Sequence, residues 1–534
     1  MSMSSCRLLV ARSGGRSPRA ARRTSEIARS RHAVKRNVDK ESPVAWRQGT
    51  VLKARVRPTW RYGRVVHRTN WSPIFERASR TAARFLEQLP DRPVAPRRDF
   101  AAMLAAFDRP VPEGPTDPEQ VIEELAGGVE PGLCAMPGGR FFGWVTGGTL
   151  PSAVAADWLT SAWDQCAHSA EPTPAAIAIE RVALRWVGEL LGVPARSAVL
   201  VTGAQMANFV SLAVARTEVL RAAGWDLAAD GLVGAPRIEV VVGAERHASI
   251  DRALRMLGIG ARQLRVIEAD TAGRMRADRL DPVGTLTGTP LIVCAQAGNV
   301  NGGAFDPLPA IAEWVAAARQ HRPVWLHLDG AFGLWARAAP ARRALADGAE
   351  LADSWATDGH KWLNTPYDCG IALLRDGDAH RRAFYGGAAY LPDDAAADHP
   401  FHHTPELSRR ARGFALWAAL RELGRSGVAD LVERCCRHAS HFAQQLAAID
   451  GVEVMNEVML NQLVVRFRDP RGGDDDAYTR RVLASVIRDG TCYPSGTTWR
   501  GRAAMRISVS NWSTDDDDVR ASVEAIARIH KTGP

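Results

Sequence analysis

Short apolar runs that alternate with helical stretches are the feature that most constrains the fold of this chain. A strand that is apolar throughout and is followed by a helix is typical of a mostly parallel sheet with helices on both faces. The sequence therefore predicts an α/β fold. The apolar runs are 198–201, 237–242, 291–295, 324–328, 353–357 and 371–374, with helices expected over 172–191 and 205–222 and from Ser249.

The sequence pattern changes on both sides of this region. An amphipathic helix is expected over 75–89, followed by a connector rich in proline up to Pro118. Beyond Pro405 we expect helices over 408–425 and 428–449, strands over 452–455, 462–467 and 504–508, and a last helix from about Asp515. The sequence thus predicts four parts: a basic head (1–70), an N-terminal helical segment (71–150), a large domain (151–404) and a small α+β domain (405–534).

The positive charge of the chain is concentrated in the head. The 534 residues have a net charge of +9, but residues 1–70 hold 18 Lys and Arg and three acidic residues, a net of +15, which leaves −6 for the rest. Low hydrophobicity and high charge favour disorder for this segment. A transit peptide and a gene start assigned too early, with the true start near Trp71, also fit. Nucleic-acid binding is less favoured, because aromatic residues do not interleave the arginine clusters.

Several classes of protein are excluded or disfavoured. No run of 18 apolar residues indicates a membrane-spanning helix, so we expect no membrane association. The eight cysteines form no CxxC pair, which argues against a disulfide framework and favours the reducing cytoplasm. HExxH, P-loop and GxSxG motifs are absent, and no metal site is expected.

The densest group of chemically useful residues lies between His327 and Trp362. Asp329 ends one apolar run, and Lys361 follows the next one. Ligand sites of open α/β sheets lie at the carboxyl ends of their strands. A partly desolvated lysine at such a place has a lowered pKa and can form a Schiff base with a carbonyl group. Taken one at a time, a surface lysine and a helix-capping aspartate would be the more common interpretation.

Together, these residues form a pattern of higher specificity. The motif HLDGAFG (327–333) is followed by DS (353–354) and DGHKW (358–362), with Lys361 lying 32 residues beyond Asp329. This pattern resembles the group II amino-acid decarboxylases that depend on pyridoxal 5'-phosphate (PLP), which include the aromatic-L-amino-acid and glutamate decarboxylases. The similarity runs from about Phe141 to the C-terminus. It implies the fold type I architecture of aspartate aminotransferase, a small-molecule amino-acid substrate, and a homodimer with each site at the subunit boundary.

The resemblance also implies roles for individual residues. Lys361 would carry the Schiff base with PLP, Asp329 would bind the protonated pyridine nitrogen, and Ala331 would leave room for the ring. His247 would stack on the other ring face, although without the family it is more simply a helix-start residue. His360, beside Lys361, is expected among the catalytic and cofactor-binding residues.

Two loops would provide the remaining cofactor contacts. Gly203, Ala204 and Gln205 lie at a strand-to-helix turn, where backbone N–H groups can bind phosphate. Gln205 stands where many relatives have serine. Asn299 falls where relatives place a donor for the phenolic oxygen of the cofactor.

The sequence departs from the family pattern in two places. Asp358 stands where many relatives have asparagine, and a carboxylate would repel phosphate, so we expect it to point elsewhere or to bond Lys361. Relatives often have a loop tyrosine that protonates the substrate carbon after carbon dioxide leaves, but residues 391–407 contain no tyrosine. His402 and His403 lie in this loop, and we expect one of them to be the acid unless both are solvated bystanders.

Trp144, Val145 and Thr146 align with the substrate side of the family's site. Their surroundings predict an apolar or aromatic substrate side chain, although an aromatic cluster is as often plain core. The leading interpretation is a PLP-dependent decarboxylase that converts an L-amino acid to its amine. The rivals are an aldehyde synthase or aminotransferase on the same scaffold, suggested by the missing tyrosine, and a non-catalytic relative whose basic head binds nucleic acid.

Overall fold

The computed structural model of the protein describes residues 70–285, 288–385 and 399–534, so the predicted basic head lies outside the described residues except for Asn70. The helices are α3 (Trp71–Glu87), α4 (Phe100–Phe107), α5 (Pro118–Val129), α6 (Pro151–Trp163), α7 (Pro174–Leu191), α8 (Ala204–Ala222), α9 (Leu227–Asp230), α10 (Ala248–Met256), α11 (Leu308–Ala318), α12 (Gly377–Phe384), α13 (Gly413–Ala447), α14 (Asp475–Asp489) and α15 (Asp516–Thr532). The strands are β1 (Ser197–Val201), β2 (Glu239–Gly243), β3 (Leu264–Ile267), β4 (Leu291–Gln296), β5 (Val324–Asp329), β6 (Ser354–Asp358), β7 (Gly370–Leu374), β8 (Val452–Val454), β9 (Gln462–Phe467), β10 (Ser495–Trp499) and β11 (Arg502–Ser508).

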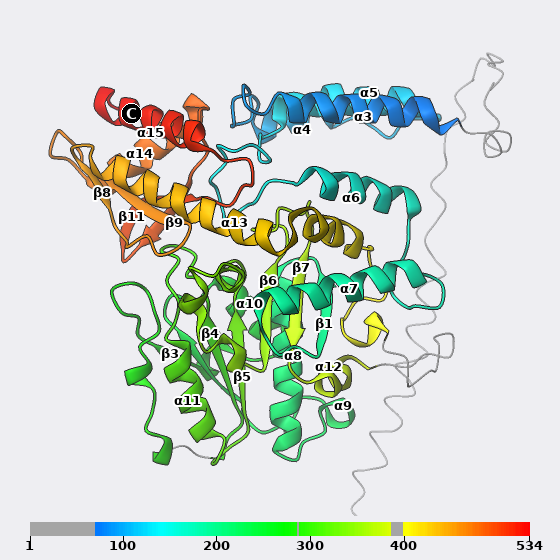
Figure 1. Ribbon diagram of the computed structural model, residues 1–534, viewed down its shortest axis with the longest axis vertical. Coiled ribbons are helices and arrows are strands. Elements are labelled where there is room, and N and C mark those ends of the chain that lie inside the picture. The colour runs from blue at the N-terminus through cyan, green and yellow to red at the C-terminus, as the bar shows by residue number, and fades with distance from the viewer. Residues whose placement is uncertain (1–69, 286–287, 386–398) are drawn as a thin grey trace, which may run out of the picture. The chain divides into compact units, whose positions relative to one another are not determined.

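The first sheet has seven strands in the order β1-β7-β6-β5-β4-β2-β3 (Figure 1). Only β7 runs antiparallel to its neighbours, and every other pairing in this sheet is parallel. The remaining six strands therefore end at the same edge of the sheet. The predicted α/β fold class is confirmed.

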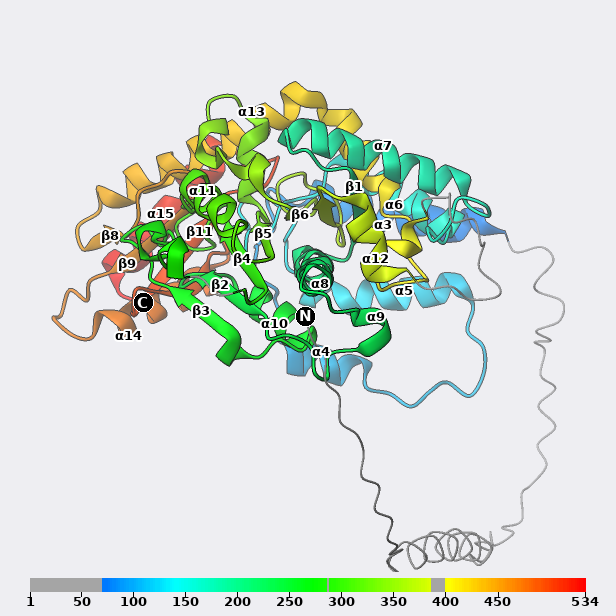
Figure 2. The ribbon, with the colours of Figure 1, turned by 90° about the horizontal axis from the view of Figure 1, so that it is seen from below.

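Helices cover both faces of this sheet, as Figure 2 shows. Along β4, Ile292 and Cys294 belong to a core that includes residues of α8 and α10. Val293 and Ala295 belong to the opposite core, which includes residues of α7, α11 and α13. All six residues of β4 are buried, which explains why this strand is apolar throughout instead of alternating.

The second sheet is antiparallel, with the order β10-β11-β9-β8. Helix α14 packs against β9 and β11, and α15 packs against α13 and α14. The two helices expected over 408–425 and 428–449 form α13, whose path is interrupted at Gly424 with φ 60°. Strand β10 and helix α14 were not expected from the sequence.

The proline-rich segment of the N-terminal region was predicted as a connector, but it contains helices. The predicted helix over 75–89 is present as α3, but the connector that follows contains α4 and α5. Asp99 caps α4 and Asp117 caps α5, and Pro118 occupies the first turn of α5. Proline is well tolerated at that position because its missing N–H would have no partner there.

Helix α6 and strand β3 were also not predicted from the sequence. Within the described ranges, no helix is long and apolar enough to cross a membrane.

Candidate active site

A cavity of about 440 Å³ opens at the edge of the sheet where the parallel strands end. Its size lies within the range of small-molecule sites. Residues that follow β1, β2, β4, β5 and β6 line it, as expected for the carboxyl edge of an open α/β sheet. The predicted site residues among its lining are Trp144, Val145, Gly203, Ala204, Gln205, His247, Asp329, Ala331, His360 and Lys361.

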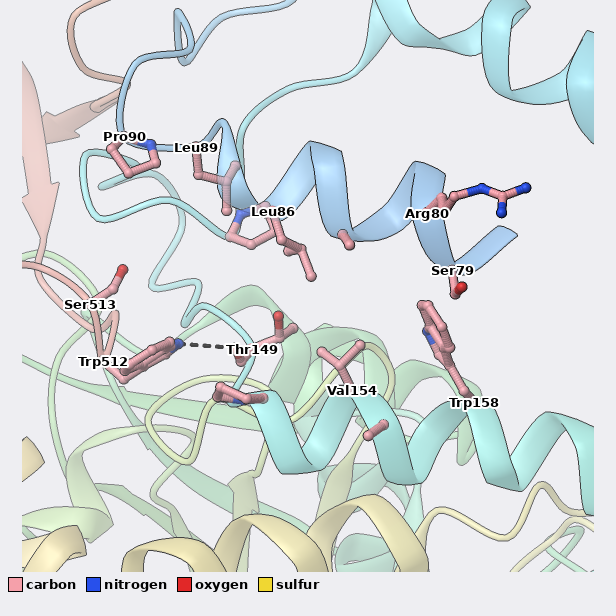
Figure 3. Close-up of a pocket in the computed structure, with 14 residues that line it drawn as sticks. Ser79, Arg80, Leu86, Leu89, Pro90, Thr149, Val154, Trp158, Trp512 and Ser513 are labelled. Atoms are coloured by element: carbon pink, nitrogen blue, oxygen red, sulfur yellow. Dashed lines mark hydrogen bonds between the residues drawn. The ribbon is translucent and has the colours of Figure 1, made fainter. Parts of the chain in front are cut away.

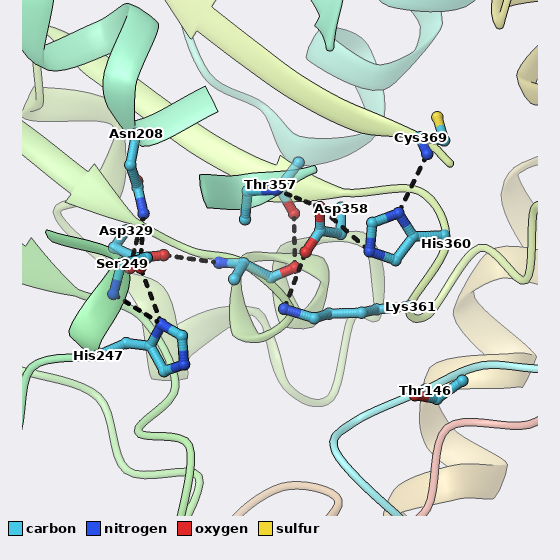
Figure 4. Close-up of polar contacts among 12 residues, drawn as sticks. Thr146, Asn208, His247, Ser249, Asp329, Thr357, Asp358, His360, Lys361 and Cys369 are labelled. Carbon is cyan, nitrogen blue, oxygen red and sulfur yellow. Dashed lines mark hydrogen bonds and ion pairs between the residues drawn. The ribbon is translucent and has the colours of Figure 1, made fainter. Parts of the chain in front are cut away.

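Lys361 lies just beyond β6 and contacts the last residue of that strand. Its Nζ is 2.8 Å from Oδ2 of Asp358, whose side chain is only 2% exposed (Figure 4). The other carboxylate oxygen of Asp358 accepts a hydrogen bond of 2.6 Å from the backbone N–H of Ala204. The structure thus agrees with the expectation that Asp358 bonds Lys361, and it adds a contact with the first residue of α8.

Asp329 ends β5 on the opposite side of the cavity and is 4% exposed. Oδ2 accepts from Nδ2 of Asn208 at 3.1 Å, and Oδ1 accepts from the N–H of Ala331 at 3.2 Å (Figure 4). These two donors hold the carboxylate in a fixed orientation at the cavity wall.

His247 precedes α10, and its orientation is fixed by Ser249. Nδ1 lies 2.8 Å from Ser249 Oγ and accepts from the Ser249 N–H at 3.2 Å. Burial lowers the pKa of His247, and the nearby Asp329 carboxylate partly offsets this effect. The His247 ring is therefore neutral at neutral pH. It is both a helix-start residue and a cavity residue, so the two interpretations of the sequence are compatible.

A chain of buried hydrogen bonds extends from these residues into the core. Asn208 donates through Nδ2 to Ser249 Oγ at 3.1 Å as well as to Asp329, and its Oδ1 lies 2.9 Å from Nε2 of His327. Nδ1 of His327 lies 2.9 Å from Ser354 Oγ. Burial lowers the pKa of His327 to about 3, so this histidine is neutral. Its Nε2 donates, because the Asn208 Oδ1 that faces it can only accept.

The loop before α8 approaches the sheet closely. A Cβ on Gly370 would lie 2.4 Å from the backbone of Gly203, so no larger residue fits at 370 without moving the loop. Gln205 donates to the carbonyl oxygen of Ser249 at 3.3 Å, which links the start of α8 to the His247 turn.

His360 faces the cavity from the other side of Asp358. Its Nδ1 accepts from the N–H of Cys369 at 3.1 Å, and its ring lies 4.4 Å from that of Tyr367. Burial lowers the pKa of His360. Because the Cys369 N–H fixes Nδ1 as an acceptor, the neutral ring presents its N–H at Nε2, 3.6 Å from Asp358 Oδ1.

The predicted substrate wall is divided between the cavity and the interior. Trp144 and Val145 line the cavity and have positive φ of 53° and 58°, which is uncommon for residues other than glycine. Thr146 is not among the lining residues, because its side chain is buried and its Oγ1 lies 3.3 Å from the hydroxyl of Tyr367.

Asn299 differs from its expected position. Its Oδ1 accepts from the N–H groups of Asn301 and Gly302, and its Nδ2 donates to the carbonyl oxygen of Glu245. The side chain is fully buried within its own turn and does not line the cavity. The geometry therefore does not support the expectation that Asn299 donates to the cofactor.

His402 and His403 do not reach the cavity of their own chain. Both are buried, at 3% and 5% exposure, so neither is a solvated loop residue. His402 stacks on Tyr385 with ring centroids 4.9 Å apart, and His403 packs edge-on against His380. The adjoining residues 391–398 of the predicted loop lie outside the described residues.

Several polar residues of this site were not predicted from the sequence, among them Asn208, Ser249 and Arg506. Asn208 lies within α8, Ser249 is the second residue of α10, and Arg506 comes from β11 of the second sheet. Arg506 lines the cavity and donates to the carbonyl oxygen of Val300 at 3.2 Å, and its buried Nε has no hydrogen-bond partner among the described residues. Burial lowers its pKa to about 10, which leaves it protonated at neutral pH.

A second cavity, of about 630 Å³, lies between α3 and α6 (Figure 3). Its lining is mainly apolar, with Leu86, Val154 and Trp158 among its walls, and Trp512 closes one end by donating to the carbonyl oxygen of Thr149. Arg80 is the one charged residue among the described residues that line it.

Comparison with known proteins identifies the family. Residues 101–468 match the pyridoxal-dependent decarboxylase conserved domain. Tryptophan decarboxylase 1 of Oryza sativa subsp. japonica is 26% identical over 439 residues, which cover 76% of this chain and 83% of the relative. The aromatic-L-amino-acid decarboxylase of Bacillus atrophaeus is 26% identical over 450 residues (81% and 90%), and the phenylacetaldehyde synthase of Arabidopsis thaliana is 23% identical over 438 residues (78% and 86%).

Solved structures show the same fold. The crystal structure of Oryza sativa TDC with PLP and tryptamine gives a TM-score of 0.79 at 23% identity and covers 86% of this chain and 97% of that one. Mouse CSAD gives 0.77 at 21% identity, with 86% and 99% covered. Fold type I, the enzyme class and the cofactor predicted from the HLDGAFG and DGHKW motifs are thereby confirmed. The chain belongs to the pyridoxal-dependent decarboxylase family, whose cofactor is pyridoxal 5'-phosphate.

Proposed function

We propose that this enzyme decarboxylates an L-amino acid to its amine and carbon dioxide, through a Schiff base at Lys361. The observation that carries the proposal is the arrangement of the cavity. An amine (Lys361) and a buried carboxylate (Asp329) extend into it from the ends of two neighbouring parallel strands, with His247 and Ala331 beside them.

The residues present fit pyridoxal 5'-phosphate. The Asp329 carboxylate can accept from a protonated pyridine nitrogen, the small Ala331 and the flat ring of His247 suit an aromatic ring, and α8 begins at the cavity with its N–H groups. Bound there, the cofactor supplies an electron sink for the bond that breaks at the substrate α-carbon.

The chain's own residues provide position and charge. Asn208 and the Ala331 N–H keep Asp329 oriented as an acceptor, and Ser249 keeps the His247 ring in place. Trp144 and Val145 cover one side of the cavity and limit the access of water. His360 holds its N–H beside Asp358, within the wall that carries Lys361.

Arg506 is our candidate for binding the substrate carboxylate. It is a buried guanidinium at the cavity, and within the described part of the chain its Nε has no hydrogen-bond partner; arginine binds carboxylates with paired hydrogen bonds. Trp144, Val145 and Phe332 provide apolar surface in the same cavity. This combination favours an amino acid with an apolar or aromatic side chain.

Borohydride trapping tests the assignment of Lys361. The chain has only five lysines, Lys35, Lys40, Lys53, Lys361 and Lys531, so a reduced pyridoxyl group is located without ambiguity by peptide mass mapping. We expect the label on Lys361 and its loss in Lys361→Ala, with Lys531→Ala as the matched control that keeps it. Labelling of another lysine in the wild type would contradict the proposal.

An aldehyde synthase is the second candidate, favoured by the lack of tyrosine in residues 391–407 and by the phenylacetaldehyde synthase among the relatives. The two activities differ in their products. A decarboxylase releases amine and carbon dioxide, whereas an aldehyde synthase consumes oxygen and water and releases aldehyde, carbon dioxide, ammonia and peroxide in place of the amine. An aminotransferase would release neither carbon dioxide nor peroxide.

We also propose that the enzyme is a cytoplasmic homodimer. Large apolar side chains are exposed on the N-terminal helices and α6, among them Trp71 (61%), Phe100 (81%) and Trp158 (45%). A second copy of the chain would cover such a surface. The free thiols of the described cysteines suit a reducing compartment. Light scattering coupled to gel filtration tests the dimer, and a monomeric mass would refute it.

A further inference from the structure

The carboxylate of Asp358 bonds two groups that cofactor binding would need. It accepts a hydrogen bond of 2.6 Å from the N–H of Ala204, the first residue of the 19-residue helix α8. Its other oxygen lies 2.8 Å from Nζ of Lys361. The side chain is 2% exposed, so little water screens its charge.

These contacts make Asp358 the resident anion at the start of α8. The N-terminus of a helix carries partial positive charge and free N–H groups, and it attracts one anion readily. A phosphate dianion and the Asp358 carboxylate would repel each other at short range, because little water screens their charges in this site. Anions from outside the chain therefore compete with Asp358 for the Ala204 N–H.

We propose that Asp358 occupies part of the cofactor phosphate position, so that phosphate binds at α8 only when Asp358 gives up the hydrogen bond from Ala204. This inference rests on the proposed orientation of the cofactor, with its phosphate at residues 203–205. Asp358 is then a residue that weakens the contribution of the phosphate group to cofactor affinity. Pyridoxal, which lacks the phosphate, does not meet this competition.

The test compares two probes on the full-length protein. Asp358→Asn keeps the size of the side chain and an oxygen for the Ala204 N–H, but removes the negative charge. Titration of the cofactor-free protein, followed by absorbance and tryptophan fluorescence, gives the Kd of pyridoxal 5'-phosphate and of pyridoxal. The readout is the ratio of the Kd of pyridoxal to that of pyridoxal 5'-phosphate, because any effect through Lys361 acts on both compounds.

We expect Asp358→Asn to raise this ratio about tenfold by tightening binding of the phosphorylated compound. Asp353→Asn is the matched control, since Asp353 also accepts from a buried backbone N–H (Leu326, 2.7 Å) and pairs with an arginine, at the opposite end of β6. The ratio should be unchanged in this variant.

An unchanged or lower ratio in Asp358→Asn would overturn the proposal. If this variant does not keep the circular dichroism spectrum of the wild type, Asp358→Ser provides the same comparison. A failure of the proposed function has a different result: the wild type would form no Schiff base with either compound, or borohydride would label a lysine other than Lys361. If borohydride labels Lys361, the ratio of the two Kd values alone tests whether Asp358 competes with the phosphate group.

Discussion

Acid should destabilise this fold through His327, the buried histidine behind Asp329. The side chain is fully buried between Ser354 and Asn208. Burial lowers its pKa from the ordinary 6.5 to about 3. At a pH above the ordinary pKa, the His327 ring is neutral in both the folded and the unfolded chain, so its titration does not change the free energy of unfolding. As the pH falls through that value, only the unfolded chain takes up the proton, so stability decreases until the pH approaches the folded-state pKa.

The size of this effect follows from the two pKa values. Each pH unit inside the window costs about 1.4 kcal/mol, so at about pH 5 the loss attributable to His327 is about 2 kcal/mol relative to about pH 8. This value depends little on the folded-state pKa, because the folded histidine is still neutral at that pH. The buried His380 has a lowered pKa too, so the acid sensitivity of the wild type is a sum.

A variant isolates the contribution of His327. His327→Gln keeps a donor for Asn208 but cannot titrate. Urea unfolding of the cofactor-free protein at the two pH values, followed by far-ultraviolet circular dichroism, gives the acid-induced loss for each protein. We expect that loss to be smaller by about 2 kcal/mol in the variant, whatever its stability at about pH 8. An equal loss in both proteins would refute the account of His327 as a neutral, buried member of the network.

Three further variants test the site and its support. Arg506→Gln should raise the KM for amino acids by about tenfold to a hundredfold and leave the Kd of pyridoxal 5'-phosphate unchanged; a change in both would argue against carboxylate binding. Ala331→Leu should abolish cofactor binding in titrations while the far-ultraviolet spectrum stays that of the wild type, because the larger side chain fills the cavity. Arg409→Met should lower the free energy of unfolding by about 3–5 kcal/mol in urea, because it leaves the buried Glu180 carboxylate without its cation at 2.8 Å; a neutral effect would show that the pair is dispensable.

The sequence predicted the part of the site that follows strands. Asp329 and Lys361 follow two apolar runs, and the carboxyl ends of parallel strands meet at one edge, so their proximity could be inferred from the pattern of strands. His247 also follows an apolar run, but its place in the site was predicted from the family resemblance. Arg506 could not be found in this way, because it belongs to a strand of the second sheet, more than 140 residues beyond Lys361. Asn208 did carry a signal, as a polar residue inside the buried helix α8.

The remaining parts of the site could not be predicted because the sequence does not show in which direction a side chain points. Asn299 lies in the expected loop, but its own turn takes up its amide, which only the backbone path determines. His402 and His403 lie in the expected loop but pack into the interior. In the N-terminal region, proline marks the beginning of α5 instead of excluding a helix, and the edge strand β10 is partly exposed and carries no apolar run.

The products formed from one amino acid test the central claim most directly. The enzyme, loaded with pyridoxal 5'-phosphate, is incubated with a panel of L-amino acids, and carbon dioxide, amine, ammonia and peroxide are measured together. The proposed function predicts equal amounts of carbon dioxide and amine from one class of amino acid, and neither product with Lys361→Ala. Peroxide and ammonia with little amine, or products that persist in Lys361→Ala, would contradict it.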